Sequence, residues 1–108
     1  MSSHVLTLTD ADFPREVLHA ELPVVVDFTA RWCAPCRVLG VTLEALAAEH
    51  AGRVKVTKLD VDDHPHTAQR FGVRSMPTLL VFKGGQVVGQ VVGAVPRARL
   101  EEVLRQVV

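Results

Sequence analysis

The chain lacks a net charge, a long apolar run and a basic leader. Its 12 Lys and Arg residues balance its 12 Asp and Glu residues, so neither nucleic acid nor an anionic membrane is indicated as a partner. No segment approaches the roughly 20 apolar residues of a membrane-spanning helix. The N-terminus, from Met1 to His4, lacks the basic start and apolar segment of a signal peptide. We therefore expect a cytoplasmic protein.

Cysteine is also scarce, because Cys33 and Cys36 are the only two in the chain. Thiols stay reduced in the cytoplasm, where a cysteine pair is more often catalytic or metal-binding than structural. A disulfide between residues three apart closes a very small loop and would stabilise the fold little. The pair therefore indicates chemistry. With 108 residues, of which 48% are hydrophobic, and no linker, repeat or low-complexity segment, residues 1–108 are expected to form one domain.

Short apolar runs predict five strands, at residues 5–8, 24–28, 54–59, 78–82 and 86–92. The second run is continuous and β-branched, which favours a central strand covered on both faces. Gly84 and Gly85 between the last two strands indicate a hairpin turn.

Helical spacing of apolar residues predicts helices after residue 10, at 34–51, at 67–71 and from 96 onward. Thr9 and Asp10 offer N-cap oxygens to the first, and Pro96 suits the first position of the last. The order of elements predicts an α/β fold with a mixed five-stranded sheet and helices on both faces. The first three strands can be parallel, while the final hairpin must be antiparallel.

The segment Trp32-Cys33-Ala34-Pro35-Cys36 lies between the predicted central strand and the long helix. Both sulfurs are expected in the first turn of that helix, with Cα atoms about 5 Å apart. A disulfide needs Cα atoms roughly 4.4–6.8 Å apart, so the pair can close or open with little backbone movement. The pattern predicts reversible dithiol–disulfide exchange.

The chain resembles the thioredoxin family along nearly its whole length. An Asp six residues before Cys33 and a Met-Pro-Thr about forty residues after Cys36 make the match far more specific than a lone Cys-x-x-Cys. The matching stretches are Val26-Asp27-Phe28, Trp32-Cys33-Ala34-Pro35-Cys36, Lys58-Leu59-Asp60-Val61-Asp62, Arg74-Ser75-Met76-Pro77-Thr78 and Val92-Gly93-Ala94. The resemblance implies the thioredoxin fold, with four helices around the sheet.

Several positions depart from the family pattern. Ala34 stands where thioredoxins usually have Gly, and Thr29 where many have a second Trp. Val41 replaces a proline that commonly kinks the active-site helix, which predicts a straighter helix. Ser75 and Met76 replace the more usual Gly and Ile.

The resemblance implies a mechanism for the cysteine pair. Cys33, at the positive end of the helix dipole, would attack a target disulfide, and the deeper, shielded Cys36 would resolve the mixed disulfide. Thioredoxins hold the thiol of this cysteine at a pKa near 7, so the resemblance implies that roughly half of Cys33 is ionised at neutral pH. Asp27, inside an apolar strand, would have a raised pKa and take the proton from Cys36, with Lys58 as its partner.

The residues around the pair would tune the chemistry and hold the target. Ala34 and Pro35 are expected to stiffen the loop. Pro77 is expected to be cis and to present the backbone of Met76 to an extended target segment. The predicted apolar docking face consists of Trp32, Val61, Met76, Pro77, Val92, Gly93 and Ala94.

The implied partners are an NADPH-dependent flavoprotein, thioredoxin reductase, and disulfide-containing target proteins. No bound cofactor is expected besides the redox-active disulfide, and no extra apolar surface suggests more than a monomer.

Other readings stay open from the sequence. An oxidase or isomerase of the same fold usually carries a His between the cysteines, which Ala34-Pro35 does not provide. A zinc site would need two more ligands, of which His64 and His66 are the only close pair. The predicted docking face could also bind other proteins without any catalytic turnover of disulfides. Asp27 could point to solvent and Lys58 could be an ordinary surface lysine.

Overall fold

Five strands form one mixed sheet in the computed structural model, which describes residues 3–108. The order across the sheet is β1-β3-β2-β4-β5, so β2 is central, as its β-branched run predicted. β1 and β2 pair with β3 in parallel, while β4 is antiparallel to both β2 and β5. The strands are β1 (Val5–Thr7), β2 (Val24–Thr29), β3 (Lys55–Asp60), β4 (Thr78–Lys83) and β5 (Gln86–Val92).

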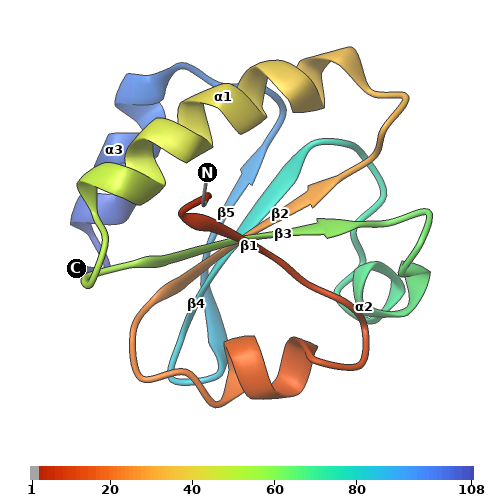
Figure 1. Ribbon diagram of the computed structural model, residues 1–108, viewed down its shortest axis with the longest axis horizontal. Helices are drawn as coiled ribbons and strands as arrows, with labels where there is room; N and C mark the ends of the chain where they lie inside the picture. Colours follow the sequence, from red (N-terminus) through yellow and green to blue (C-terminus); the bar gives the residue numbers. More distant parts are fainter. Residues whose placement is uncertain (1–2) are drawn as a thin grey trace.

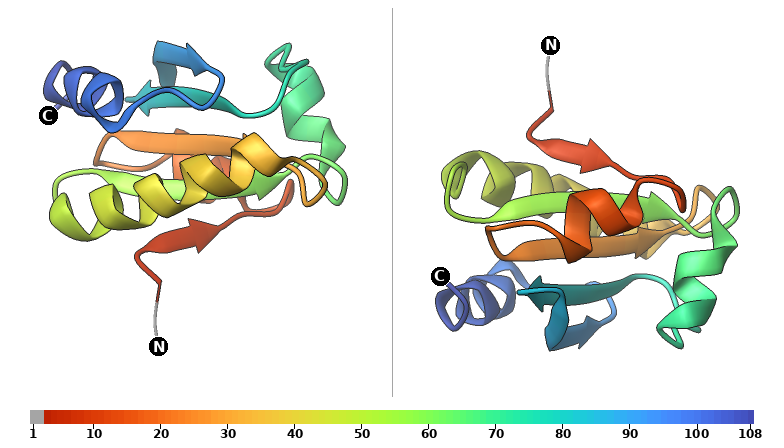
Figure 2. Two further views of the ribbon diagram at one scale, coloured as in Figure 1. Left: turned by 90° about the horizontal axis from the view of Figure 1, so that it is seen from above. Right: turned by 90° about the horizontal axis from the view of Figure 1, so that it is seen from below.

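Four helices cover the two faces of this sheet (Figures 1 and 2). α1 (Ala34–Glu49) and α3 (Arg97–Arg105) share one hydrophobic cluster, which includes Val25 of β2. The π-helix η1 (Pro14–Leu18) and α2 (Pro65–Arg70) share the other, which includes Val24 and Val26. Neighbouring side chains of a strand point to opposite faces, so these two clusters lie on opposite faces of the sheet. The predicted α/β fold is confirmed.

The first helix begins later than the sequence predicted, because its N-cap is Phe13 and neither Thr9 nor Asp10. Thr9 and Asp12 exchange hydrogen bonds one turn earlier: the Asp12 amide donates to Thr9 Oγ1 at 3.1 Å and the Thr9 amide to Asp12 Oδ1 at 2.7 Å. The carboxylate of Asp10 instead accepts from the amides of His66 and Thr67, at 3.1 and 2.9 Å. Asp10 therefore caps α2, which has no cap from its own N-cap residue His64.

The last helix also differs from the prediction. Pro96 is its N-cap and not its first helical residue, because its ψ of 155° is extended. The expected helix ends are otherwise within a few residues of those observed. α1 runs without interruption through Val41 and is followed by Gly52 at a φ of 84°.

The turn between β4 and β5 requires glycine. Gly84 and Gly85 have φ values of 60° and 80°, which suits the two central residues of a tight hairpin. A Cβ at Gly85 would also lie 2.9 Å from the carbonyl oxygen of Leu18. The predicted hairpin is confirmed. Within residues 3–108, no helix has the length and apolar character needed to cross a membrane.

Candidate active site: a disulfide beside a buried carboxyl

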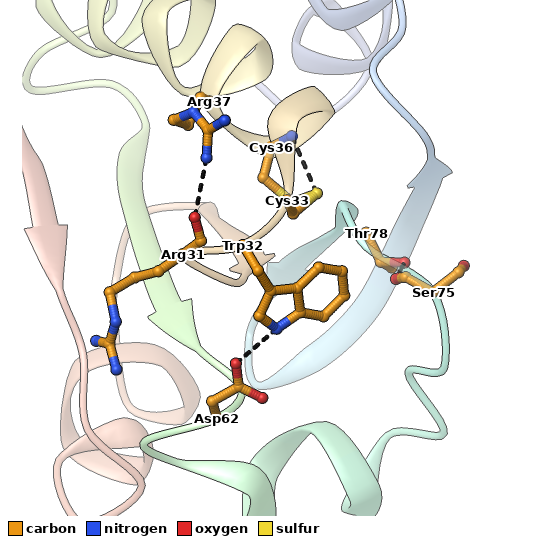
Figure 3. Close-up of a disulfide and its surroundings, with 8 residues drawn as sticks. All are labelled: Arg31, Trp32, Cys33, Cys36, Arg37, Asp62, Ser75 and Thr78. Atoms are coloured by element: carbon orange, nitrogen blue, oxygen red, sulfur yellow. Dashed lines mark hydrogen bonds between the residues drawn. A yellow bond between two sulfur atoms is a disulfide. The ribbon is translucent and has the colours of Figure 1, made fainter.

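Cys33 and Cys36 form a disulfide at the N-terminus of α1, with their Cα atoms 5.2 Å apart. Cys33 is the N-cap of the helix and lies just outside its first turn, one step from the predicted position. The Cys36 amide donates a hydrogen bond to Cys33 Sγ at 3.2 Å (Figure 3). A sulfur that accepts a helix N-terminal N–H is placed where negative charge is stabilised.

Burial alone does not rank the two sulfurs. The exposed fractions are 4% for Cys33 and 3% for Cys36, so the expectation that Cys36 is the more shielded receives no support from exposure. Both pack with Ala30, and the half-buried Val61 and Met76 lie against them. The difference between the cysteines is their place on the helix: Cys33 caps it, while Cys36 is inside its first turn.

Asp27 lies in the middle of β2 and is only 3% exposed. Its Oδ1 has no hydrogen-bond partner among the described residues. Burial raises the pKa of Asp27 to about 7, although the nearby charge of Lys58 opposes the shift. The possibility that Asp27 points to solvent is therefore wrong, and the expectation of a raised pKa is supported by its burial.

Lys58 lies directly opposite Asp27 in the parallel register of β2 and β3. Its side chain is exposed, and it lines the same hollow as Asp27. Lys58 is therefore a surface lysine whose charge acts on the buried carboxyl, and its role as the functional partner of Asp27 stays a prediction.

One hollow of about 490 Å³ reaches Asp27 and Cys36 together. The hollow is large enough to hold water beside both side chains. The other lining residues are Thr7, Thr29, Ala30, Arg31, Arg37, Gly40, Lys58, Asp60 and Asp63.

An ion-pair network at the rim of this hollow was not foreseen from the sequence. Arg31 donates two hydrogen bonds to the Asp63 carboxylate, at 2.8 and 3.1 Å, and lies 3.4 Å from Asp60. These bonds hold the pKa of Asp63 below its ordinary value and raise that of Arg31. Arg37 of α1 donates to the Arg31 carbonyl at 2.9 Å (Figure 3). The network ties the loop before Cys33 to the loop after β3.

A signal for this network was present in the sequence. Arg31 lies just after β2. Asp60 is the last residue of β3, and Asp62 and Asp63 follow it. The carboxyl ends of parallel neighbouring strands meet at the same edge of a sheet, so an Arg and an acidic group placed there can be expected to meet.

The predicted docking face gathers around the disulfide. Trp32 is 70% exposed, and its Nε1 donates to Asp62 Oδ2 at 2.8 Å (Figure 3). The Met76-Pro77 peptide bond is cis, as expected. The Gly93 amide donates to the Pro77 carbonyl at 2.9 Å, which brings the end of β5 to the same loop.

The remaining predicted residues lie around this loop and the start of α1. Val61 is half-buried against the disulfide, Val92 is 54% exposed at the end of β5, and Ala94 is exposed just beyond it. Ala34 and Pro35 are the exposed first two residues of α1.

His64 and His66, the histidines that a zinc site would use, belong to the start of α2. His64 Nδ1 accepts the Asp10 amide at 3.3 Å. Across residues 3–108, no group of three or more Cys, His, Asp or Glu side chains is arranged to hold a metal ion.

Comparison with known proteins agrees with this geometry. Residues 4–106 match the family model described as Thioredoxin. The chain is 48% identical over 99 residues to a thioredoxin of Synechocystis sp., with 92% of each chain covered. It is 47% identical over 104 residues to a thioredoxin of Haemophilus influenzae, covering 96% of this chain and 97% of the relative. It is also 47% identical over 106 residues to thioredoxin C-2 of Corynebacterium nephridii, with 98% of each covered.

Proposed function

The chain belongs to the thioredoxin family of protein-disulfide oxidoreductases, and we propose that it acts as a general reductant of protein disulfides. The Cys33–Cys36 disulfide is its redox-active group. The observation that carries the direction of the reaction is the helix N-terminus at Cys33, where, among the described residues, the Cys36 backbone N–H is the hydrogen-bond donor to the sulfur. Such a site lowers the thiol pKa moderately, which suits a reductant.

The reduced pair would act in two exchanges. The Cys33 thiolate attacks one sulfur of the target disulfide, forming a mixed disulfide and releasing the other target sulfur as a thiolate, which takes a proton from solvent. Cys36 then loses its proton and attacks Cys33 Sγ. This step forms the Cys33–Cys36 disulfide and releases the second target thiol, so the target gains the two electrons that the pair loses.

Asp27 is proposed to receive the Cys36 proton. The support for this role is its burial, its pKa of about 7 and the hollow that it shares with Cys36. A base with a pKa near the working pH transfers protons most efficiently. Lys58, across the strand pair, would stabilise the carboxylate form and keep that pKa from rising further.

We propose that a target docks as an extended segment along the face formed by Trp32, Val61, Met76, Pro77, Val92, Gly93 and Ala94. The support is their clustering around the disulfide and the exposure of Trp32 and Val92. Residues 1–108 would work as one monomeric domain in the cytoplasm, where they would support redox homeostasis. An NADPH-dependent thioredoxin reductase would return the electrons.

Insulin reduction by dithiothreitol tests the activity directly. The protein should accelerate the precipitation of insulin chains, and a Cys33→Ser variant should not. If wild type leaves the uncatalysed rate unchanged, the face is at most a binding module. A second assay, with NADPH and a thioredoxin reductase in place of dithiothreitol, tests the proposed electron donor.

The reduction potential separates a reductant from an oxidase or isomerase of the same fold. Ala34 and Pro35 bring no side-chain donor to the Cys33 sulfur, so the thiolate should not be stabilised strongly enough to make the disulfide oxidising. We expect a potential near about −270 mV, the value common to thioredoxins, and a value above about −180 mV would contradict the proposal.

A further inference from the structure

A second hollow of about 490 Å³ lies beside Trp32, and neither Asp27 nor either cysteine lines it. It is bounded by α2, by the loop before Pro77 and by Trp32, so it continues the docking face away from the disulfide. Figure 3 shows Trp32 and Ser75, two of its lining residues, on either side of this region. The full lining is Trp32, Val61, Pro65, Ala68, Gln69, Val73, Arg74, Ser75 and Met76.

Arg74 is the one charged side chain in this lining. It is exposed, and within residues 3–108 it forms neither an ion pair nor a side-chain hydrogen bond, so its guanidinium donors are free. Asp62, which accepts the indole N–H of Trp32, does not line the hollow. The hollow therefore combines a mostly apolar lining, in which Gln69 and Ser75 are the neutral polar residues, with one positive charge that pairs with no described acidic side chain.

We propose that Arg74 binds an Asp or Glu side chain close to the target cysteine and so favours acidic target segments. The inference depends on the proposed reductase function. A segment that pairs with the backbone before Pro77 is extended, so alternate side chains point toward the protein. One of them enters the hollow beside Arg74, where a carboxylate can accept two parallel N–H bonds from the guanidinium.

Single-cysteine peptides test this selection. In each peptide the cysteine forms a mixed disulfide with 2-mercaptoethanol. A single Asp is placed at one of the three positions before or the three positions after that cysteine, one position per peptide. Lys and Ser peptides of the same sequence provide the comparison. At one or two positions on one side of the cysteine, the Asp peptide should be reduced with a kcat/KM about fivefold above that of the Ser peptide. The Lys peptide should be slower than the Ser peptide.

Arg74→Gln should abolish this preference, so that the Asp and Ser peptides are reduced with equal kcat/KM, and Arg74→Glu should reverse it in favour of Lys. The matched control is Arg70→Gln. Arg70 is a nearby exposed arginine that lies over the Phe71 ring, 5.1 Å from its centroid, and does not line the hollow. Its removal should leave the preference intact, and about 1 M salt should weaken the preference in wild type, because the Debye length is then about 3 Å.

The result also separates this inference from the function on which it rests. Reduction of the Ser peptide with equal rates for Asp, Ser and Lys at every position would overturn the role of Arg74 and leave the reductase intact. An Asp preference that survives in Arg74→Gln would overturn it as well. Failure to reduce even the Ser peptide would overturn both.

Discussion

At the scale of single residues, the candidate site contains a carboxyl whose burial makes ionisation unfavourable. Asp27 is buried without a hydrogen bond to its Oδ1, and its pKa rises from 3.8 to about 7. In the unfolded chain the group ionises at its ordinary pKa, while in the folded protein it stays protonated until about pH 7. Stability is therefore lost as the pH rises from about 4 to 7, by on the order of 4 kcal/mol.

Asp27→Ala should therefore stabilise the protein. At pH 8 we expect the free energy of unfolding to rise by about 2–4 kcal/mol, because the variant removes the ionised buried group and leaves only a small void. Below about pH 4 the two proteins should differ little, since Asp27 is protonated in both states. Urea unfolding of the oxidised proteins across this pH range measures the effect.

The same variant should slow exchange at neutral pH, because Cys36 loses its proton acceptor. Asp27→Asn, which keeps the shape of the side chain, is the matched control and should be equally slow. A destabilised Asp27→Ala variant that retains full activity would contradict both the burial argument and the proton transfer.

Cys36→Ser should leave the first exchange intact and block the second. The mixed disulfide with Cys33 should then accumulate and appear on non-reducing gels as a covalent complex with target proteins. The reciprocal variant, Cys33→Ser, should trap far less. Equal trapping by both variants, or trapping through Cys36 alone, would show that the assigned order of attack is wrong.

At the scale of elements, a contact far apart in the sequence positions α2. Its six residues have no cap from His64, and Asp10 supplies the missing acceptor through the amides of His66 and Thr67 and the Thr67 hydroxyl. Burial alone would raise the pKa of Asp10, but these hydrogen bonds outweigh it and lower the pKa. The stabilisation should therefore persist down to about pH 4 and disappear as the pH falls below the lowered pKa.

Asp10→Ala should destabilise the protein by about 1–2 kcal/mol at pH 7, the usual effect of losing a helix cap. Glu102→Ala is the control, because Glu102 pairs with Arg99 on the exposed face of α3 and should contribute less than about 1 kcal/mol. Thermal and urea unfolding measure both. Equal, small losses in the two variants would mean that α2 does not depend on the distant cap.

Ala34→Gly restores the residue usual in the family at the first position of α1. Ala34 is exposed and helical there, so the change adds freedom to the unfolded chain and should lower stability by about 0.4–1 kcal/mol. Unfolding of the oxidised proteins by urea would reveal it. A more stable Gly variant would show that the backbone at this position is strained by the Ala side chain.

The sequence predicted those elements whose signals are local. The β-branched run made β2 recognisable, and Gly84 and Gly85 fixed the hairpin. The cap supplied by Asp10 could not be predicted, because its partners lie 56 and 57 residues away. The start of α3 was placed one residue early, because a proline at the first position of a helix and one at the N-cap give the same pattern.

At the scale of the whole molecule, the fold forms the candidate site because two neighbouring parallel strands end at the same side of the sheet. β2 brings Asp27, β3 brings Lys58, and the loops that follow them bring the disulfide and the Arg31 network. The sequence and the family resemblance predicted the pairing of Cys33 with Cys36, the raised pKa of Asp27 and the cis bond at Pro77, because each stands in a distinctive motif. They did not identify Arg31 or the hollow beside Arg74, because those depend on how separate loops meet.

The central claim is that the N-terminus of α1 holds the Cys33 sulfur as a thiolate near neutral pH. Ultraviolet titration of a reduced Cys36→Ser variant measures this directly, since Cys33 is then the only thiol. We expect a midpoint near pH 7, as is usual for the family. A midpoint at about 8.5, the value of an ordinary cysteine, would contradict it.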